Sequence, residues 1–258
     1  MKLAICLSIA LFLGSVPFAQ SIGPVEFLDG LVLYHAYDEG KGSDAEDLSG
    51  NKHDGVIDNP TWVNGKFGQA LEFGGQGSDA FVTVESTPAL NVDACTFMAW
   101  INAEHWDGVR QVVGKSVHGG CGGRVQYGLF SEAGVFKLRL ETESGRADIS
   151  TDLPETDEFV HIAFTSDTKK AKIYYNGEEV VEGDVPGKLG ANEDPWRIGQ
   201  DCDRLNYVFA GIIDEVRLWN RALSEDEINT FMDQGVDALA VEAAGKLSTT
   251  WSRLKAGH

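Results

Sequence analysis

The stretch YVFAGIIDEVRLW, residues 207–219, alternates as a single long β-strand does. Successive side chains of a strand point to opposite faces, so every second residue shares a face. Counted this way, Glu215 and Arg217 share one face of the strand. Asp214 lies on the other face, which is otherwise apolar: Val208, Ala210, Ile212, Val216 and Leu218. The stretch therefore predicts a strand that carries one carboxylate on its packed side.

Short extended runs, separated by Gly, Asn and Asp, precede this strand. We expect strands at residues 31–37, 80–84, 95–101, 111–115, 125–130, 135–140, 159–165 and 172–175. Asn176-Gly177 predicts a hairpin after the last of these runs, because both central residues of a type I′ turn need positive φ. Strands this numerous, with no helix between them, indicate antiparallel sheets. The expected fold class is an all-β, two-sheet sandwich.

One short helix is expected after the long strand. Ser224 and Glu227 have the spacing of a capping box, in which each residue's side chain accepts from the other's backbone N–H. Ile228, Phe231 and Met232 follow at helical spacing, and Gly235 ends the pattern. The sequence thus predicts a C-terminal helix with one apolar stripe.

The composition excludes several classes of protein. The chain has 258 residues, of which 43% are hydrophobic, so it can bury a sizeable core. Its 30 glycines are too many for a helical bundle and follow no Gly-X-Y period. A formal net charge of −19 repels phosphate backbones, so nucleic acid is not an expected partner.

The first twenty residues read as a secretory signal peptide. A positive start at Lys2 precedes the apolar run 3–16, and cleavage is expected near Ala19. No later stretch is apolar enough to predict a membrane span after cleavage. We expect a secreted protein, extracellular or periplasmic, with one domain at residues 28–235. The Ala-rich residues 236–258 form a C-terminal tail outside it.

Seven motifs, in order along the chain, resemble one known family. They are Leu33-Tyr34 with Asp38-Glu39-Gly40, residues 47–51 (DLSGN), 65–73 (GKFGQALEF), 96–100 (TFMAW), 161–163 (HIA), 174–177 (YYNG) and 209–224 (FAGIIDEVRLWNRALS). In this succession the chain resembles the laminin-G-like jelly-roll family of the concanavalin A-like lectin/glucanase superfamily. The resemblance implies two packed antiparallel sheets, one of them concave. It also implies a secreted module of a kind that often binds glycans or proteins and often carries a calcium ion.

A structural calcium site is expected near the first strand. Asp38 follows this strand, and Asp47 and Asn51 lie in a loop that turns at Gly50. Hard oxygen ligands at a glycine bend suit Ca²⁺, and the resemblance favours it. Asp214 would be the fourth ligand, because a carboxylate on an apolar face needs a cation or several hydrogen-bond donors. The alternatives are an arginine or backbone partner for Asp214 and a solvated turn in the loop.

A ligand-binding surface is expected around Trp106, which lies in a polar connection where its indole could stack on a sugar ring. Its polar companions would be Arg124, Asp203 and Tyr207. For Trp62 and Trp196, which lie in similar connections, plugging the end of the sandwich is an equally good interpretation.

Catalysis is not expected from the carboxylates of the long strand. A glycosidase needs two carboxyl groups facing one cleft, whereas Asp214 and Glu215 are adjacent and should point to opposite faces. We therefore expect a non-catalytic binding module, most simply for carbohydrate, whose partner is a glycan or an extracellular protein. The alternatives are a protein–protein adhesion module and a glycan-cleaving enzyme of the same fold.

The cysteines predict one disulfide. Export permits a bridge, and Cys121 and Cys202 both lie in Gly- or Asp-rich connections that can approach each other. Cys95 instead opens an apolar strand, where a small buried thiol suffices. We expect a Cys121–Cys202 bridge and a free Cys95.

Overall fold

The computed structural model describes residues 28–116, 125–201 and 207–235 of the chain. These residues form sixteen strands, one 3₁₀ turn and one α-helix. The strands are β1 Leu31–His35, β2 Asp44–Ala45, β3 Gly55–Asp58, β4 Thr61–Asn64, β5 Gln69–Gly74, β6 Phe81–Val84, β7 Cys95–Ala103, β8 Arg110–Ser116, β9 Val125–Glu132, β10 Val135–Thr142, β11 Gly145–Thr151, β12 Val160–Ser166, β13 Lys170–Tyr175, β14 Glu178–Asp184, β15 Trp196–Ile198 and β16 Ala210–Trp219. The 3₁₀ turn is Pro88–Leu90, and helix α2 is Glu225–Met232.

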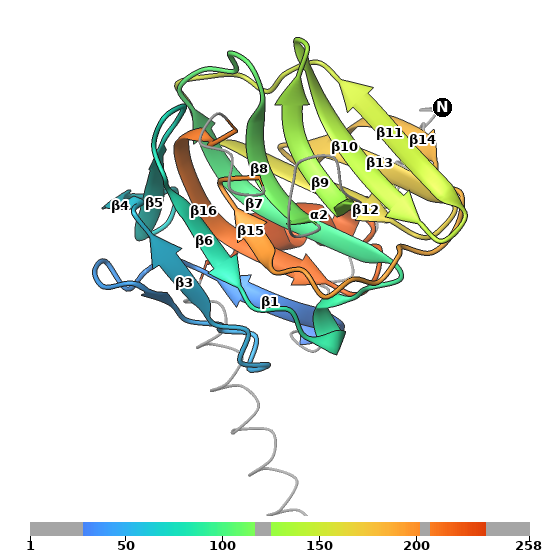
Figure 1. The fold of residues 1–258 in the computed structure, drawn as a ribbon, viewed down its shortest axis with the longest axis horizontal. Coiled ribbons are helices and arrows are strands. Elements are labelled where there is room, and N and C mark those ends of the chain that lie inside the picture. The colour runs from blue at the N-terminus through green and yellow to red at the C-terminus, as the bar shows by residue number, and fades with distance from the viewer. Residues whose placement is uncertain (1–27, 117–124, 202–206, 236–258) are drawn as a thin grey trace, which may run out of the picture.

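The strands make two eight-stranded antiparallel sheets that pack face to face as a jelly-roll sandwich (Figure 1). The β16 sheet has the order β14-β13-β12-β7-β16-β5-β4, with β1 also paired to β16. The β8 sheet has the order β11-β10-β9-β8-β15-β6-β3-β2. The inner faces of both sheets supply the main core, which is rich in aromatic rings such as Phe97, Phe164 and Trp196. The predicted two-sheet fold with one helix is confirmed.

Helix α2 covers the outer face of the β16 sheet, where it makes a second, smaller core. The ring of Phe231 stacks on that of Trp219 at 5.8 Å between centroids, and Ile228 packs beside them. The predicted capping box is present: the N–H of Glu227 donates to Ser224 Oγ, and the N–H of Ser224 donates to the Glu227 carboxylate. The helix is thus started by its own sequence and held by the sheet below it.

Carbonyls at the C-terminus of α2 and just beyond it accept hydrogen bonds from side chains of the sheet. Arg217 Nη1 donates to the carbonyl of Phe231 at 2.7 Å, and Arg217 Nη2 donates to that of Gln234. Trp100 Nε1 donates to the carbonyl of Met232 at 2.9 Å. The last carbonyls of a helix have no partner within the helix, and the guanidinium charge also complements the negative end of the helix dipole. Arg217 therefore fixes where α2 ends on the sheet.

A β-bulge in β16 corrects the predicted facing of its residues. The register against β7 shifts between Asp214 and Arg217, and Glu215 adopts a left-handed φ of 56°. Asp214 lies opposite Trp100, and Arg217 lies opposite Met98, a residue of the outer core. Val216 and Leu218 belong to the main core. The expectation that Asp214 shares their face is wrong, because the extra residue at the bulge changes the alternation.

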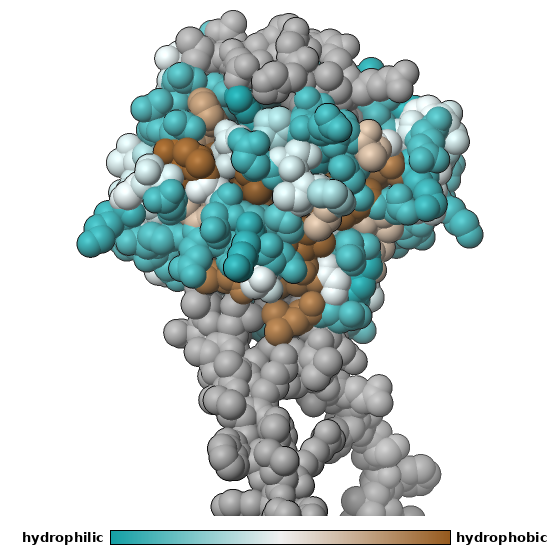
Figure 2. All heavy atoms as spheres, turned by 60° about the horizontal axis from the view of Figure 1, so that its bottom comes forward, coloured by the Kyte–Doolittle hydropathy of each residue, from teal (hydrophilic) through white to brown (hydrophobic). Residues whose placement is uncertain are grey.

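Few large apolar side chains reach the surface of the described residues. Only Val56 and Val180 among them are strongly exposed, at 50% and 40%. Figure 2 shows one face that is mostly hydrophilic, with hydrophobic residues in small separate groups. In the described part of the chain, no helix is both long and apolar enough to cross a bilayer.

Candidate functional site

Two neighbouring pockets lie at the end of the sandwich where β7 ends and β12 begins. The loop 152–158 separates them, and both pockets are lined by Leu153. Hydrogen bonds hold this loop in place: Trp106 Nε1 donates to the carbonyl of Pro154 at 2.9 Å, and the N–H of Asp157 donates to that of Ala103 at 2.8 Å. The pockets are therefore built on a fixed frame.

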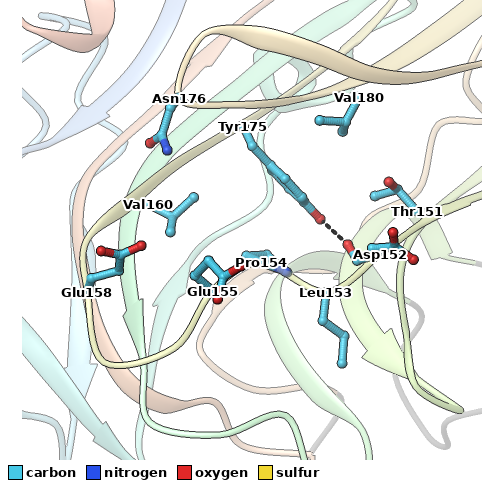
Figure 3. Close-up of a pocket in the computed structure, with 10 residues that line it drawn as sticks. All are labelled: Thr151, Asp152, Leu153, Pro154, Glu155, Glu158, Val160, Tyr175, Asn176 and Val180. Atoms are coloured by element: carbon cyan, nitrogen blue, oxygen red, sulfur yellow. Dashed lines mark hydrogen bonds between the residues drawn. The ribbon is translucent and has the colours of Figure 1, made fainter.

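The first pocket, here called the Tyr175 pocket, has a volume of about 380 Å³ (Figure 3). Its lining comes from the loop after β11, the start of β12 and the β13–β14 hairpin: Thr151, Asp152, Leu153, Pro154, Glu155, Glu158, Val160, Tyr175, Asn176 and Val180. Apolar and aromatic walls thus adjoin carboxylates and an amide. This combination suits a ligand that has both hydrocarbon and hydrogen-bonding surface.

Tyr175 is the central side chain of this pocket. Its hydroxyl donates to the backbone carbonyl of Asp152 at 2.8 Å, and its ring packs against Phe136 at 6.0 Å between centroids. Burial and the nearby Asp152 carboxylate raise the pKa of the phenol above its usual value, so it stays neutral. In Figure 3 the carboxylates of Asp152 and Glu158 lie on either side of the ring.

The hairpin beside Tyr175 is the one that Asn176-Gly177 predicts. The two residues have φ values of 48° and 84°, as a type I′ turn requires. Asn176 Oδ1 accepts from the backbone N–H of His161, and Asn229 of helix α2 donates to the carbonyl of Gly177. The outer helix thus supports the rim of the pocket.

The second pocket, here called the Trp106 pocket, has a volume of about 560 Å³. Its lining comes from the connection after β7, the β9–β10 hairpin and the loop 152–158: Glu104, His105, Trp106, Asp107, Gly108, Ala133, Gly134, Leu153 and Thr156. Ala133 and Gly134 have φ values of 54° and 80°, so this hairpin too turns through two residues of positive φ. No Lys or Arg is among the described residues that line either pocket.

Trp106 itself is not the open stacking surface that its polar surroundings suggested. Its side chain is only 9% exposed and belongs to the main core. Its ring packs edge-on against Phe136 at 5.3 Å and Phe209 at 5.6 Å, and its indole N–H is used by Pro154. That part of the expected site is wrong, because strands distant in sequence close over the ring. Trp106 contributes a wall of the pocket and holds the loop.

The other predicted ligand residues are only partly placed. Tyr207 is half-buried, and its carbonyl accepts from the N–H of Gln111 at the start of β8. Arg124 and Asp203 lie outside the described residues, as do Cys121 and Cys202 of the expected bridge, the expected signal peptide and the tail. Cys95 opens β7 as a fully buried free thiol. Sequence reasoning missed Tyr175, although the polar, Pro-containing loop 151–158 directly before a strand could have indicated a site there.

Asp47 organises the loop after β1 through four hydrogen bonds. Its Oδ1 accepts from the N–H groups of Tyr34 and Ser49, and its Oδ2 accepts from the Ser49 hydroxyl and the N–H of His53. Burial alone would raise the pKa of Asp47, but these donors outweigh it and hold the pKa below its usual value. A carboxylate has about four lone-pair sites, so none is left for Ca²⁺.

The remaining expected metal ligands do not converge on Asp47. Asn51 donates to the carbonyls of Leu31 and Val32, and Asp38 accepts from the N–H of Gln69. Asp214 accepts from the N–H of Phe67, in the same β4–β5 hairpin as Gln69. The described residues contain no group of three or more His, Cys, Asp or Glu side chains suited to a metal ion. The geometry therefore does not fit one calcium ion shared by Asp47 and Asp214.

Asp47→Ala is expected to lower the free energy of unfolding by about 2–4 kcal/mol, because four donors lose their acceptor. The loss should be the same with added calcium and with chelator, measured by thermal or chemical denaturation. Asp44→Ala, an exposed acid in the same segment, is the matched control. Calcium that stabilised the wild type but not Asp47→Ala would show instead that the loop binds the ion.

Asp214 lies fully buried beside the bulge, with Oδ1 unpaired. Burial raises the pKa of Asp214 to about 8; the Phe67 N–H opposes this shift and the nearby Glu215 adds to it. The two carboxylates were expected on opposite faces. The bulge instead brings both to the outer side, where Glu215 accepts from Tyr34 Oη at 2.6 Å and pairs with Arg217. Asp214 thus has the backbone partner that was the alternative to an ion, and its raised pKa also favours the protonated form, which the sequence did not suggest.

A two-sheet jelly roll with ligand-sized pockets at one end defines a class of fold shared by lectins and glucanases. A family model described as the concanavalin A-like lectin/glucanases superfamily matches residues 76–229. The chain belongs to this superfamily, as its motifs indicated. No curated protein matches the chain.

Solved structures of similar fold share little sequence with the chain. The binding domain of Paraclostridial Mosquitocidal Protein 1 has a TM-score of 0.64 and 19% identity, over 79% of this chain and 52% of that one. Domain 4 of AbnA, an extracellular arabinanase from Geobacillus stearothermophilus in complex with arabinotriose, has a TM-score of 0.56 and 17% identity, over 78% and 97%. The binding domain of botulinum neurotoxin DC, in complex with rat synaptotagmin II, has a TM-score of 0.61 and 16% identity, over 79% and 51%. The chain spans about half the length of the two toxin structures, and at these identities the likeness shows the fold alone.

Proposed function

We propose that this protein is an exported, non-catalytic carbohydrate-binding module whose ligand occupies the Tyr175 pocket. The observation that carries the proposal is the pocket itself, where Tyr175 and Val160 adjoin Asp152, Glu158 and other hydrogen-bonding groups. Sugar rings present apolar C–H faces to aromatic and aliphatic walls and hydroxyls to carboxylates and amides. The arabinotriose complex of the AbnA domain supports carbohydrate as the ligand class for this fold.

The carboxylates of the pocket favour binding over hydrolysis. Asp152, Glu155 and Glu158 are all exposed, whereas a glycosidase holds its acid protonated by burying it. Hydrolysis remains the second candidate, because Glu155 and Glu158 line the same pocket. Incubating the protein with the glycans that it binds, and following release of reducing ends, distinguishes the two functions. If the wild type releases reducing ends and Glu158→Gln does not, the protein is a glycan-cleaving enzyme.

The purified protein is screened on a glycan array, with calcium and with chelator. We expect the screen to yield a ligand that Tyr175→Ala binds at least tenfold more weakly than the wild type does. The ring supplies the aromatic wall, and tenfold corresponds to about 1.4 kcal/mol. Tyr175→Phe keeps the ring and is the matched control, expected to bind nearly as the wild type does. Affinities are measured by calorimetry on variants with an unchanged thermal transition.

Because the Tyr175 ring also packs on the core, a second variant is needed that tests the pocket without disturbing the core. Asp152→Ala removes an exposed side chain but keeps the backbone carbonyl that Tyr175 bonds. Weaker binding by this variant supports the site. If both Asp152→Ala and Tyr175→Ala bind the ligand with full affinity, the ligand binds outside the Tyr175 pocket. Binding of an extracellular protein but no glycan would favour an adhesion module, with the exposed Val180 on the pocket rim as a contact.

A further inference from the structure

The Tyr175 pocket and the Trp106 pocket adjoin each other across one side chain. Leu153 lines both, and the loop that carries it runs between them. In Figure 3 the Leu153 side chain points away from Tyr175, on the opposite side of its loop from the ring. The indole N–H of Trp106 donates to the carbonyl of Pro154, and the N–H of Asp157 donates to that of Ala103. These bonds hold the apolar ridge that Leu153 forms between the two pockets.

The charged side chains of the two pockets have one sign. Asp152, Glu155 and Glu158 line the first, and Glu104 and Asp107 line the second. The second pocket also contains His105, whose Nδ1 lies 3.8 Å from the Asp107 carboxylate. All five carboxylates are exposed to solvent, and neither pocket includes a Lys or Arg among its described residues. Such a surface repels anionic glycans and attracts cationic ligands.

We infer that the two pockets form one groove with two subsites, which binds a linear oligosaccharide of amino sugars; this inference rests on the proposed function. A protonated amino sugar offers an ammonium group with three N–H donors for the carboxylates. It also offers an apolar ring face for Tyr175 and for the Leu153 ridge. Successive sugars carry the charge at regular intervals, so both pockets can be filled by the same unit. A basic peptide shares the charge but lacks the ring faces.

The test compares a glucosamine tetramer with its N-acetylated counterpart by calorimetry, at mildly acidic pH and at low and high salt. The charged tetramer is expected to bind at least tenfold more tightly at low salt, and high salt should remove most of the difference because exposed charges are screened. Equal affinity for the two tetramers would overturn the charge preference. Tighter binding of a lysine-rich peptide than of either tetramer would overturn the sugar assignment.

Charge reversals test whether both pockets take part. Glu158→Lys in the first pocket and Asp107→Lys in the second should each lower the affinity for the glucosamine tetramer by about threefold to tenfold. Both side chains are exposed, Asp107 at 95%, so the fold should be retained. Asp44→Lys changes the net charge equally on β2, at the opposite edge of the β8 sheet from β10 and β11, and should have no such effect. An unchanged affinity in Asp107→Lys would overturn the second subsite.

The two proposals fail in different ways. If the protein binds only neutral or anionic glycans on the array, and this binding depends on Tyr175, the amino-sugar inference is wrong and the proposed function stands. If no glycan of any charge binds, both are wrong.

Discussion

Arg217→Met is expected to lower the free energy of unfolding by about 3–5 kcal/mol, the usual loss when one partner of a buried ion pair is removed. Arg217 and Glu215 are 1% and 2% exposed, and the guanidinium also stacks over the Tyr34 ring at 4.5 Å. Without Arg217, the Glu215 carboxylate stays buried with only the Tyr34 hydroxyl as a described hydrogen-bond donor. The carbonyls at the end of α2 lose donors as well.

Thermal unfolding measures this loss as a fall in Tm of roughly ten degrees, since each kcal/mol shifts Tm by about 2–4 °C in a domain of this size. Lys170→Met removes a similar charge from the exposed pairs with Glu182 and Asp184 and should change the stability far less, because exposed ion pairs contribute little. The double variant Glu215→Gln with Arg217→Met should lose less than Arg217→Met alone, because no buried charge is left unpaired. Equal effects of Arg217→Met and Lys170→Met would show that the pair is not buried in solution.

Asp214→Asn is expected to gain stability relative to the wild type as pH rises from about 4 to about 8. The pKa of Asp214 is raised from 3.8 to about 8 in the folded protein. Within that window the folded state binds a proton that the unfolded state has released, so the wild type loses stability with rising pH. The shift corresponds to about 4–6 kcal/mol at most over the whole window. Asparagine cannot ionise, and its amide oxygen can still accept from the Phe67 N–H.

Chemical denaturation at several pH values gives the difference between variant and wild type. The difference should rise by up to about 1.4 kcal/mol per pH unit and then level off above the raised pKa. Asp47→Asn is expected to show the opposite pH dependence. The pKa of Asp47 is lowered in the folded protein, so the ionised carboxylate stabilises the wild type above the pKa of the unfolded state. That stabilisation is lost only as the solution becomes acidic. A flat difference for Asp214→Asn between about pH 5 and pH 8 would mean that Asp214 is ionised throughout.

Local signals in the sequence were sufficient where one turn or one helix end decides the structure. Asn176-Gly177 forms its hairpin, and Ser224 with Glu227 forms its capping box. Both depend on residues within a few positions of each other, so neighbouring sequence determines them. The long strand was also found, although it begins at Ala210 rather than at Tyr207.

The candidate site could not be derived in the same way. The bulge at Glu215 places a non-glycine residue at positive φ, and nothing in the alternation of residues 207–219 marks it. The burial of Trp106 depends on Phe136 and Phe209, which come from other strands. The Tyr175 pocket likewise exists only because the loop after β11 meets the β13–β14 hairpin. These features follow from tertiary packing, which a single sequence does not reveal.

The position of β16 sets the order in which this protein can fold during synthesis. Residues 210–219 come late in the chain, yet they join β7 on one side and both β5 and β1 on the other. Tyr34 and Glu215, which meet across this junction, are 181 residues apart. Before the ribosome has delivered β16, the facing edges of β5 and β7 have no partner and can recruit strands of other chains. A nascent chain therefore exposes these two edges until β16 emerges, and closure of so distant a contact is expected to slow folding.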